Sequence, residues 1–116
     1  EQIVISGHKM SVARAMDMAL IRGARKVIPL KVGGALHSGL MDPAKSELQK
    51  LLSEMEFCDP EVPIIANCTG RPLKTSEEIK NELVSQISGC VQWKRSVDQM
   101  ISFGVTNFLE IGPGKA

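Results

Sequence analysis

Aromatic side chains are scarce in this chain, whose 116 residues include three Phe, one Trp and no Tyr. Proteins that bind single-stranded nucleic acid stack the bases on aromatic rings. A net charge of +1 gives no field that would attract a polyanion. No apolar run in the sequence reaches the roughly 18 residues that a membrane-spanning helix needs. We therefore expect neither a nucleic-acid partner nor a membrane.

Cysteine is also sparse. The chain has three cysteines, Cys58, Cys68 and Cys90. Their number is odd, they lie far apart in the sequence, and they form no CxxC pair. This pattern argues against a disulfide framework and against a zinc site. We expect no metal and no bound cofactor, and a reducing compartment such as the cytoplasm.

The first third of the chain has a strand–helix–strand pattern. Residues 2–6 form a short β-rich run that ends at Gly7, and residues 26–32 alternate as a second strand. Between them, Val12, Met16, Ala19 and Leu20 recur on one face of a helix. This spacing is half of a split βαβ unit, so residues 1–32 are predicted to be part of a ferredoxin-like subdomain.

The rest of the chain alternates helices and strands. The expected elements are, in order, a glycine-rich loop at residues 33–39, a helix capped by Asp42, a strand at residues 62–66, helices opening at Thr75 and Trp93, and a strand at residues 107–111. Thr75 and Glu78 have the spacing of a capping box. The pattern predicts an α/β chain with about four helices and four or five strands, paired in parallel in the second half.

His37 is the first candidate for chemistry. It lies in the glycine-rich loop between a strand and a helix, where α/β proteins often place reactive groups. An imidazole titrates near neutral pH and suits proton transfer. The alternative is a loop histidine that only hydrogen-bonds to the backbone.

Four segments together resemble one enzyme family. The run VGGALHSGLMDPA at residues 32–44 resembles the histidine motif of malonyl-CoA:acyl carrier protein transacylases. The runs QIVISG at residues 2–7, VQW at 91–93 and EIGPGK at 110–115 resemble three further segments of that family, in the same order. A single motif would be weak evidence, whereas four in order are specific to the family.

The resemblance implies both a fold and a reaction. It implies a ferredoxin-like fragment at residues 1–32, followed at residues 33–116 by the C-terminal part of an α/β-hydrolase-like acyltransferase domain. It also implies transfer of a malonyl group from coenzyme A to the phosphopantetheine thiol of acyl carrier protein, in fatty-acid biosynthesis. Coenzyme A thioester is then a substrate, and acyl carrier protein is a partner. The chain has no Gly-x-Ser-x-Gly elbow, so we expect it to be a piece of a longer protein that carries the serine upstream, and to be inactive alone.

The same resemblance assigns two candidate catalytic residues, His37 and Gln86. His37 would be the general base and acid for the serine. Gln86 would orient the histidine through its main-chain carbonyl; the alternative is an exposed helical glutamine. Ser38 is not expected to act as the nucleophile for His37, because side chains adjacent along an extended chain point apart.

Several alternatives stay open at this stage. One alternative is the acyltransferase domain of a polyketide synthase, a near relative with the same chemistry in another pathway. A catalytically silent module that docks a carrier protein is a rival of another class. Leu36 stands where the family commonly has Phe, so the malonyl preference is open. The basic group Arg22, Arg25, Lys26 and Lys31 is either a docking surface for an acidic carrier or a solvated face. We also expect self-association through the edges of the strands at residues 62–66 and 107–111.

Overall fold

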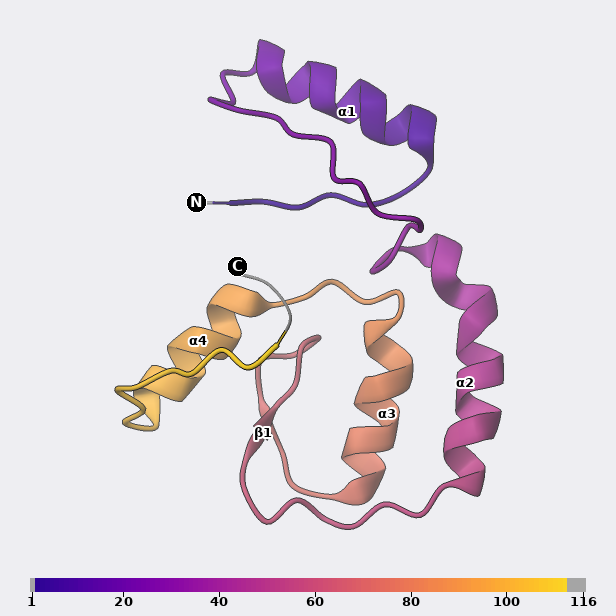
Figure 1. Cartoon of the computed structure of the whole chain (residues 1–116), viewed down its shortest axis with the longest axis vertical. Helices are drawn as coiled ribbons and strands as arrows, with labels where there is room; N and C mark the ends of the chain where they lie inside the picture. Colours follow the sequence, from indigo (N-terminus) through magenta and orange to yellow (C-terminus); the bar gives the residue numbers. More distant parts are fainter. Residues whose placement is uncertain (1, 113–116) are drawn as a thin grey trace.

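Four α-helices make up most of the regular structure. The structure, a computed structural model, describes residues 2–112. Its elements are, in order, α1 (Lys9–Ile21), the 3₁₀ helix η1 (Gly39–Met41), α2 (Asp42–Glu54), β1 (Ile64–Ile65), β2 (Pro72–Leu73), α3 (Ser76–Gln86) and α4 (Trp93–Ser102). Figure 1 shows α1 at one end of the molecule, and the hairpin with α2, α3 and α4 at the other. Within residues 2–112, no helix has the length and apolar character that crossing a bilayer requires.

The helix boundaries follow local signals in the sequence. Gly23 and Gly104 adopt φ of 90° and 85° just beyond α1 and α4, a conformation that favours glycine and ends a helix. At the start of α3, the Thr75 hydroxyl accepts the N–H of Glu78, and the Glu78 carboxylate accepts the N–H of Thr75. The capping box predicted from the sequence is therefore present.

The start of α2 differs in detail from the prediction. Asp42 is the first residue of the helix, Pro43 is the second, and Met41 occupies the N-cap position. The carboxylate of Asp42 makes no capping bond; it pairs with Lys45 at 2.9 Å. The predicted aspartate cap is wrong because the chain enters α2 directly from the 3₁₀ turn η1, which leaves no extended residue for a cap.

The sheet is smaller than predicted. The strand expected at residues 62–66 is reduced to β1, which pairs antiparallel with β2 in the register Ile64 to Leu73 and Ile65 to Pro72. The parallel pairing predicted for this half is wrong. The link from Ala66 to Arg71 is a tight turn, with Gly70 at φ 63°. A parallel partner needs a crossover of a dozen or more residues.

Three other predicted strands are not formed among the described residues. Residues 2–6, 26–32 and 107–111 lack strand structure, although their sequences are β-rich. A strand needs a neighbour for its N–H and C=O groups, and residues 2–112 provide none for these segments. Their apolar side chains are exposed, for example Ile3 at 80% and Leu109 at 89%.

The buried core is small. Leu52 of α2, Ala66 after β1 and Ser96 of α4 are the buried side chains of the described chain, and α2 packs against α3. The Ser96 hydroxyl donates to the carbonyl of Gln92 at 3.1 Å, so this buried polar group is satisfied within its own helix.

The molecule is expanded for its size. Its accessible surface of 9733 Å² compares with about 6,200 Å² for a compact protein of this mass. Its radius of gyration of 16.7 Å compares with about 13 Å for a compact domain. Both comparisons indicate a surface that a complete domain would cover.

Candidate active site

His37 has a left-handed backbone. Its φ is 60°, and it is the single non-glycine residue with a positive φ among residues 2–112. This conformation is uncommon for a residue with a side chain. It turns the chain between the glycine-rich segment and η1, and the N–H of His37 donates to the carbonyl of Ile87 at 2.9 Å. The main chain therefore fixes this histidine against the residue that follows α3.

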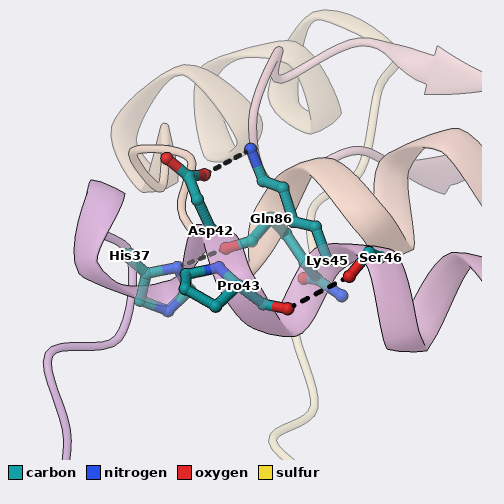
Figure 2. Close-up of polar contacts among 6 residues, drawn as sticks. All are labelled: His37, Asp42, Pro43, Lys45, Ser46 and Gln86. Atoms are coloured by element: carbon teal, nitrogen blue, oxygen red, sulfur yellow. Dashed lines mark hydrogen bonds and ion pairs between the residues drawn. The ribbon is translucent and has the colours of Figure 1, made fainter.

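The imidazole ring is held at the same place. Nδ1 of His37 lies 2.8 Å from the carbonyl oxygen of Gln86 (Figure 2). A carbonyl oxygen only accepts hydrogen bonds, so Nδ1 carries the proton in this contact. In a neutral ring, Nε2 is then the acceptor and is available to take a proton from another group.

The two carbonyls belong to the end of a helix. The last C=O groups of an α-helix have no partner within it. Gln86 is the final residue of α3 and Ile87 is its C-cap, so their carbonyls are free to accept hydrogen bonds from the loop. One residue earlier, the carbonyl of Ser85 accepts the N–H of Gly89 at 2.8 Å. The end of α3 thereby positions His37, which lies 49 residues away in sequence.

Sequence reasoning missed two residues that shape this turn. The side chain of Gln86 accepts a hydrogen bond from Nδ2 of Asn67 at 2.9 Å. A methyl group added at Gly89 would lie 2.6 Å from Sγ of Cys68 and 2.7 Å from the Ser85 carbonyl oxygen. Gly89 could have been predicted as a structural glycine, because it follows a predicted helix closely. Asn67 could not have been predicted, because its partner Gln86 is distant in sequence.

Asp42 lies close to this site at the start of α2 (Figure 2). The ion pair with Lys45 and a hydrogen bond from Ser88 lower the pKa of its carboxyl group. Ser88 belongs to the turn after α3, so Asp42 links that turn to α2. The hydroxyl of Ser38 donates to the carbonyl of Ala35 at 2.6 Å, which engages it with the main chain.

The remaining predicted features lie on the surface. The basic residues are all exposed, which fits both of the readings given above; they are Arg22, Arg25, Lys26 and Lys31. Of the family-like run at residues 110–115, residues 113–115 lie outside the part of the chain that the structure describes. Within residues 2–112, no group of three or more His, Cys, Asp or Glu side chains is placed to hold a metal ion.

The structure thus brings His37 and Gln86 together. The arrangement is a histidine whose Nδ1 is positioned by a main-chain carbonyl, with Nε2 available for proton transfer. A carbonyl in this role requires no Asp or Glu as third partner.

The chain is similar to curated bacterial enzymes, although no protein-family profile matches it. It is 40% identical over 114 residues to the malonyl CoA-acyl carrier protein transacylase of Bacillus subtilis, which covers 98% of this chain and 36% of that protein. It is 35% identical to the transacylase of the same name from Staphylococcus aureus, over 98% of this chain and 37% of that protein.

Solved structures give the same result. A complex of a type II PKS acyl-carrier protein with its malonyl-transacylase matches with a TM-score of 0.89 and 36% identity, over 93% of this chain and 35% of that one. The malonyl-CoA:acyl carrier protein transacylase of Xanthomonas oryzae pv. oryzae matches with a TM-score of 0.87 and 32% identity, over 93% of this chain and 34% of that one.

These comparisons confirm the resemblance seen in the four motifs, and they confirm the predicted fold class as a fragment of the acyltransferase fold. The chain spans about 36% of the length of the curated relatives it matches.

Proposed function

We propose that this chain is the histidine-bearing part of a malonyl-CoA:acyl carrier protein transacylase that acts in fatty-acid biosynthesis. The observation that carries the proposal is the contact between Nδ1 of His37 and the carbonyl of Gln86, in a chain similar to transacylases over nearly its whole length. The nucleophilic serine would come from a part of the protein outside these 116 residues. The Gly-x-Ser-x-Gly elbow that would carry it does not occur in them.

In this proposal His37 moves one proton in each half of the reaction. Nε2 takes the proton of the serine hydroxyl as its oxygen attacks the thioester carbonyl of malonyl-CoA. The C–S bond breaks, the proton passes to the departing sulfur, and coenzyme A leaves as a thiol. In the second half, Nε2 takes the proton of the carrier protein's phosphopantetheine thiol, whose sulfur attacks the acyl-serine ester. The proton returns to the serine oxygen.

Gln86 acts as a positioning residue in this scheme. Its carbonyl keeps the proton on Nδ1, which leaves the lone pair of Nε2 directed to the site of reaction. An imidazole held at two points, ring and main chain, loses less freedom in the transition state than a mobile one.

Substrates, partner and compartment belong to the same proposal. Coenzyme A thioester is a substrate, acyl carrier protein is the acceptor, and no resident cofactor is invoked. A reducing compartment such as the cytoplasm is proposed because Cys58, Cys68 and Cys90 are all free thiols.

A chimeric enzyme tests the proposal. The 114 matched residues of this chain would replace their counterparts in the Bacillus subtilis relative, and malonyl transfer from malonyl-CoA to holo-acyl carrier protein would be measured. We expect the chimera to be active and His37→Ala to lower kcat by about 10²–10⁴-fold, the usual contribution of a general acid–base. The 116-residue chain alone should show no turnover.

The matched control for His37→Ala is Lys50→Ala. Lys50 lies on the solvent side of α2, where it pairs with Glu47, and its loss should leave kcat unchanged. A His37→Ala chimera that folds and retains the parent rate would remove His37 from the mechanism.

A second candidate is the same transfer in polyketide synthesis. It is favoured by the solved complex of a malonyl-transacylase with a type II PKS acyl-carrier protein, to which this chain is similar. Comparing the chimera's kcat/KM for fatty-acid and polyketide carrier proteins separates the two pathways. A silent carrier-binding module would bind either carrier without turnover.

A further inference from the structure

Two of the three cysteines lie beside one another in the fold. A methyl group placed on Gly89 would be 2.6 Å from Sγ of Cys68, so this sulfur packs directly against the Gly89 backbone. Cys90 is the next residue, and consecutive Cα atoms are about 3.8 Å apart, which puts the Cα of Cys90 within about 8 Å of that sulfur. Residues 22 positions apart in sequence are thereby neighbours in the fold.

The backbone holds the two segments together. The N–H of Gln92 donates to the carbonyl of Asn67 at 2.7 Å, and the N–H of Cys68 donates to Glu82 at 2.9 Å. Both cysteines lie outside helices and strands, in the turn after β1 and in the loop between α3 and α4. A small movement of that loop therefore breaks no helix or strand hydrogen bonds.

The two thiols differ in accessibility. Cys90 is exposed, whereas Cys68 is half-buried. Burial, and then the Glu82 carboxylate and Cys90, raise the pKa of the Cys68 thiol. A dissolved oxidant therefore meets Cys90 first, and Cys68 is the neighbour that can resolve the product.

We propose that Cys68 and Cys90 form a peroxide-responsive dithiol, a modification site separate from the acyl-transfer chemistry. Hydrogen peroxide oxidises Cys90 to a sulfenic acid: an S–O bond forms, the O–O bond breaks, and one water leaves. The sulfur of Cys68 then attacks the sulfur of Cys90. The S–S bond forms, the S–O bond breaks, and the hydroxyl leaves with the thiol proton as a second water. Two thiols and one peroxide give one disulfide and two waters.

The crosslink acts on the turn that positions His37. Cys90 is four residues beyond Gln86, and the N–H of Gly89 closes the end of α3 onto Ser85. A disulfide between Cys90 and Cys68 would tie the residues after α3 to the turn after β1. The Gly89–Ser85 hydrogen bond already ties the same residues to α3. Oxidation therefore couples the redox state of the solution to the rigidity of the carbonyls that hold His37.

Peptide mapping of the oxidised chain tests the proposal. Wild-type protein and the variants Cys58→Ser, Cys68→Ser and Cys90→Ser would be treated with hydrogen peroxide, alkylated and digested with a glutamate-specific protease. Glu61 and Glu82 separate the three cysteines into different peptides. We expect a linked pair of peptides containing Cys68 and Cys90, formed in wild type and in Cys58→Ser and absent from the other two variants.

Amide hydrogen exchange supplies a second readout that does not need enzyme activity. The Gly89 amide should exchange about tenfold more slowly in the oxidised chain, because its opening now strains the crosslink. Disulfides that include Cys58, linkage between two chains, or oxidation of Cys90 that stops at the sulfenic, sulfinic or sulfonic acid would each overturn the proposal. So would unchanged exchange at Gly89 in the crosslinked protein.

Discussion

At the scale of the residue, His37 depends on main-chain groups more than on side chains. Its ring and its N–H contact the carbonyls of two successive residues, Gln86 and Ile87. Side-chain substitutions at those positions leave both acceptors in place. The position of His37 therefore does not depend on which side chains occupy positions 86 and 87.

The first prediction follows for Gln86. In the chimeric enzyme, Gln86→Ala should lower kcat by less than about tenfold, because it removes only the bond from Asn67, worth roughly 0.5–1.5 kcal/mol. Steady-state kinetics would measure this. Asn67→Ala removes the same bond from the other side, so the double variant should lose no more than either single one. A loss as large as that of His37→Ala would mean that the side chain itself acts in the reaction.

A second prediction concerns Gly89. Gly89→Ala should lower the free energy of unfolding by about 1–3 kcal/mol, because the added methyl group meets Cys68 and the Ser85 carbonyl oxygen at distances that force a shift. Urea unfolding followed by circular dichroism would measure it. Gly34→Ala is the matched control, since nothing lies within 4 Å of its added methyl group. Equal stabilities for the two variants would contradict the packing described here.

The sequence predicted the pair at the site but not its surroundings. His37 and Gln86 came from motifs that resemble a family, since no spacing or periodicity links residues so far apart. The loop position of His37 was visible from the glycines around it. Asn67, Gly89 and Asp42 act through the turn after α3, and such contacts depend on tertiary packing that a single sequence does not encode locally.

At the scale of the element, helices and strands differ in how far they can be predicted. All four helices were expected from apolar periodicity, caps and glycines, which are signals within the helix itself. Strands depend on a neighbour, and three β-rich segments have none among residues 2–112. The β-propensity of those segments was correctly recognised, but propensity alone makes no ladder.

The capping box of α3 gives the third prediction. Thr75→Ala should destabilise the chain by about 1 kcal/mol, because the N–H of Glu78 loses its acceptor at the start of the helix. Thermal unfolding would register the change. Ser76→Ala is the control: Ser76 contributes its backbone N–H to Asp59, a bond that the substitution preserves. If Thr75→Ala and Ser76→Ala lower the melting temperature by the same amount, loss of the capping bond does not explain the destabilisation.

At the scale of the whole molecule, many large apolar side chains are exposed. The expanded shape leaves large side chains uncovered in the extended segments, including Ile28, Leu109 and Ile111, and on α4, where Ile101 is exposed. Monomeric proteins seldom expose apolar area on this scale. The chain spans about a third of its relatives, whose remaining length offers a natural cover for this surface.

The fourth prediction is self-association of the isolated chain. Sedimentation velocity at micromolar concentrations should show assemblies larger than a monomer that dissociate on dilution. Leu109→Lys and Ile111→Lys should each weaken the association about tenfold or more, because each removes an apolar side chain that is 89% and 94% exposed, respectively, in the monomer. Asn107→Lys adds the same charge to the same segment without removing apolar area, and it should have a smaller effect. A concentration-independent monomer would refute the prediction.

The left-handed backbone of His37 has a consequence for protein engineering. A side chain at φ 60° costs roughly 1–2 kcal/mol relative to glycine, about as much as the hydrogen bond of its ring returns. His37→Gly is therefore close to neutral for folding, although it removes the group proposed for proton transfer. A directed-evolution campaign that selects only for heat resistance would have no means of retaining this histidine. A library built on this fold must be screened for turnover in every round.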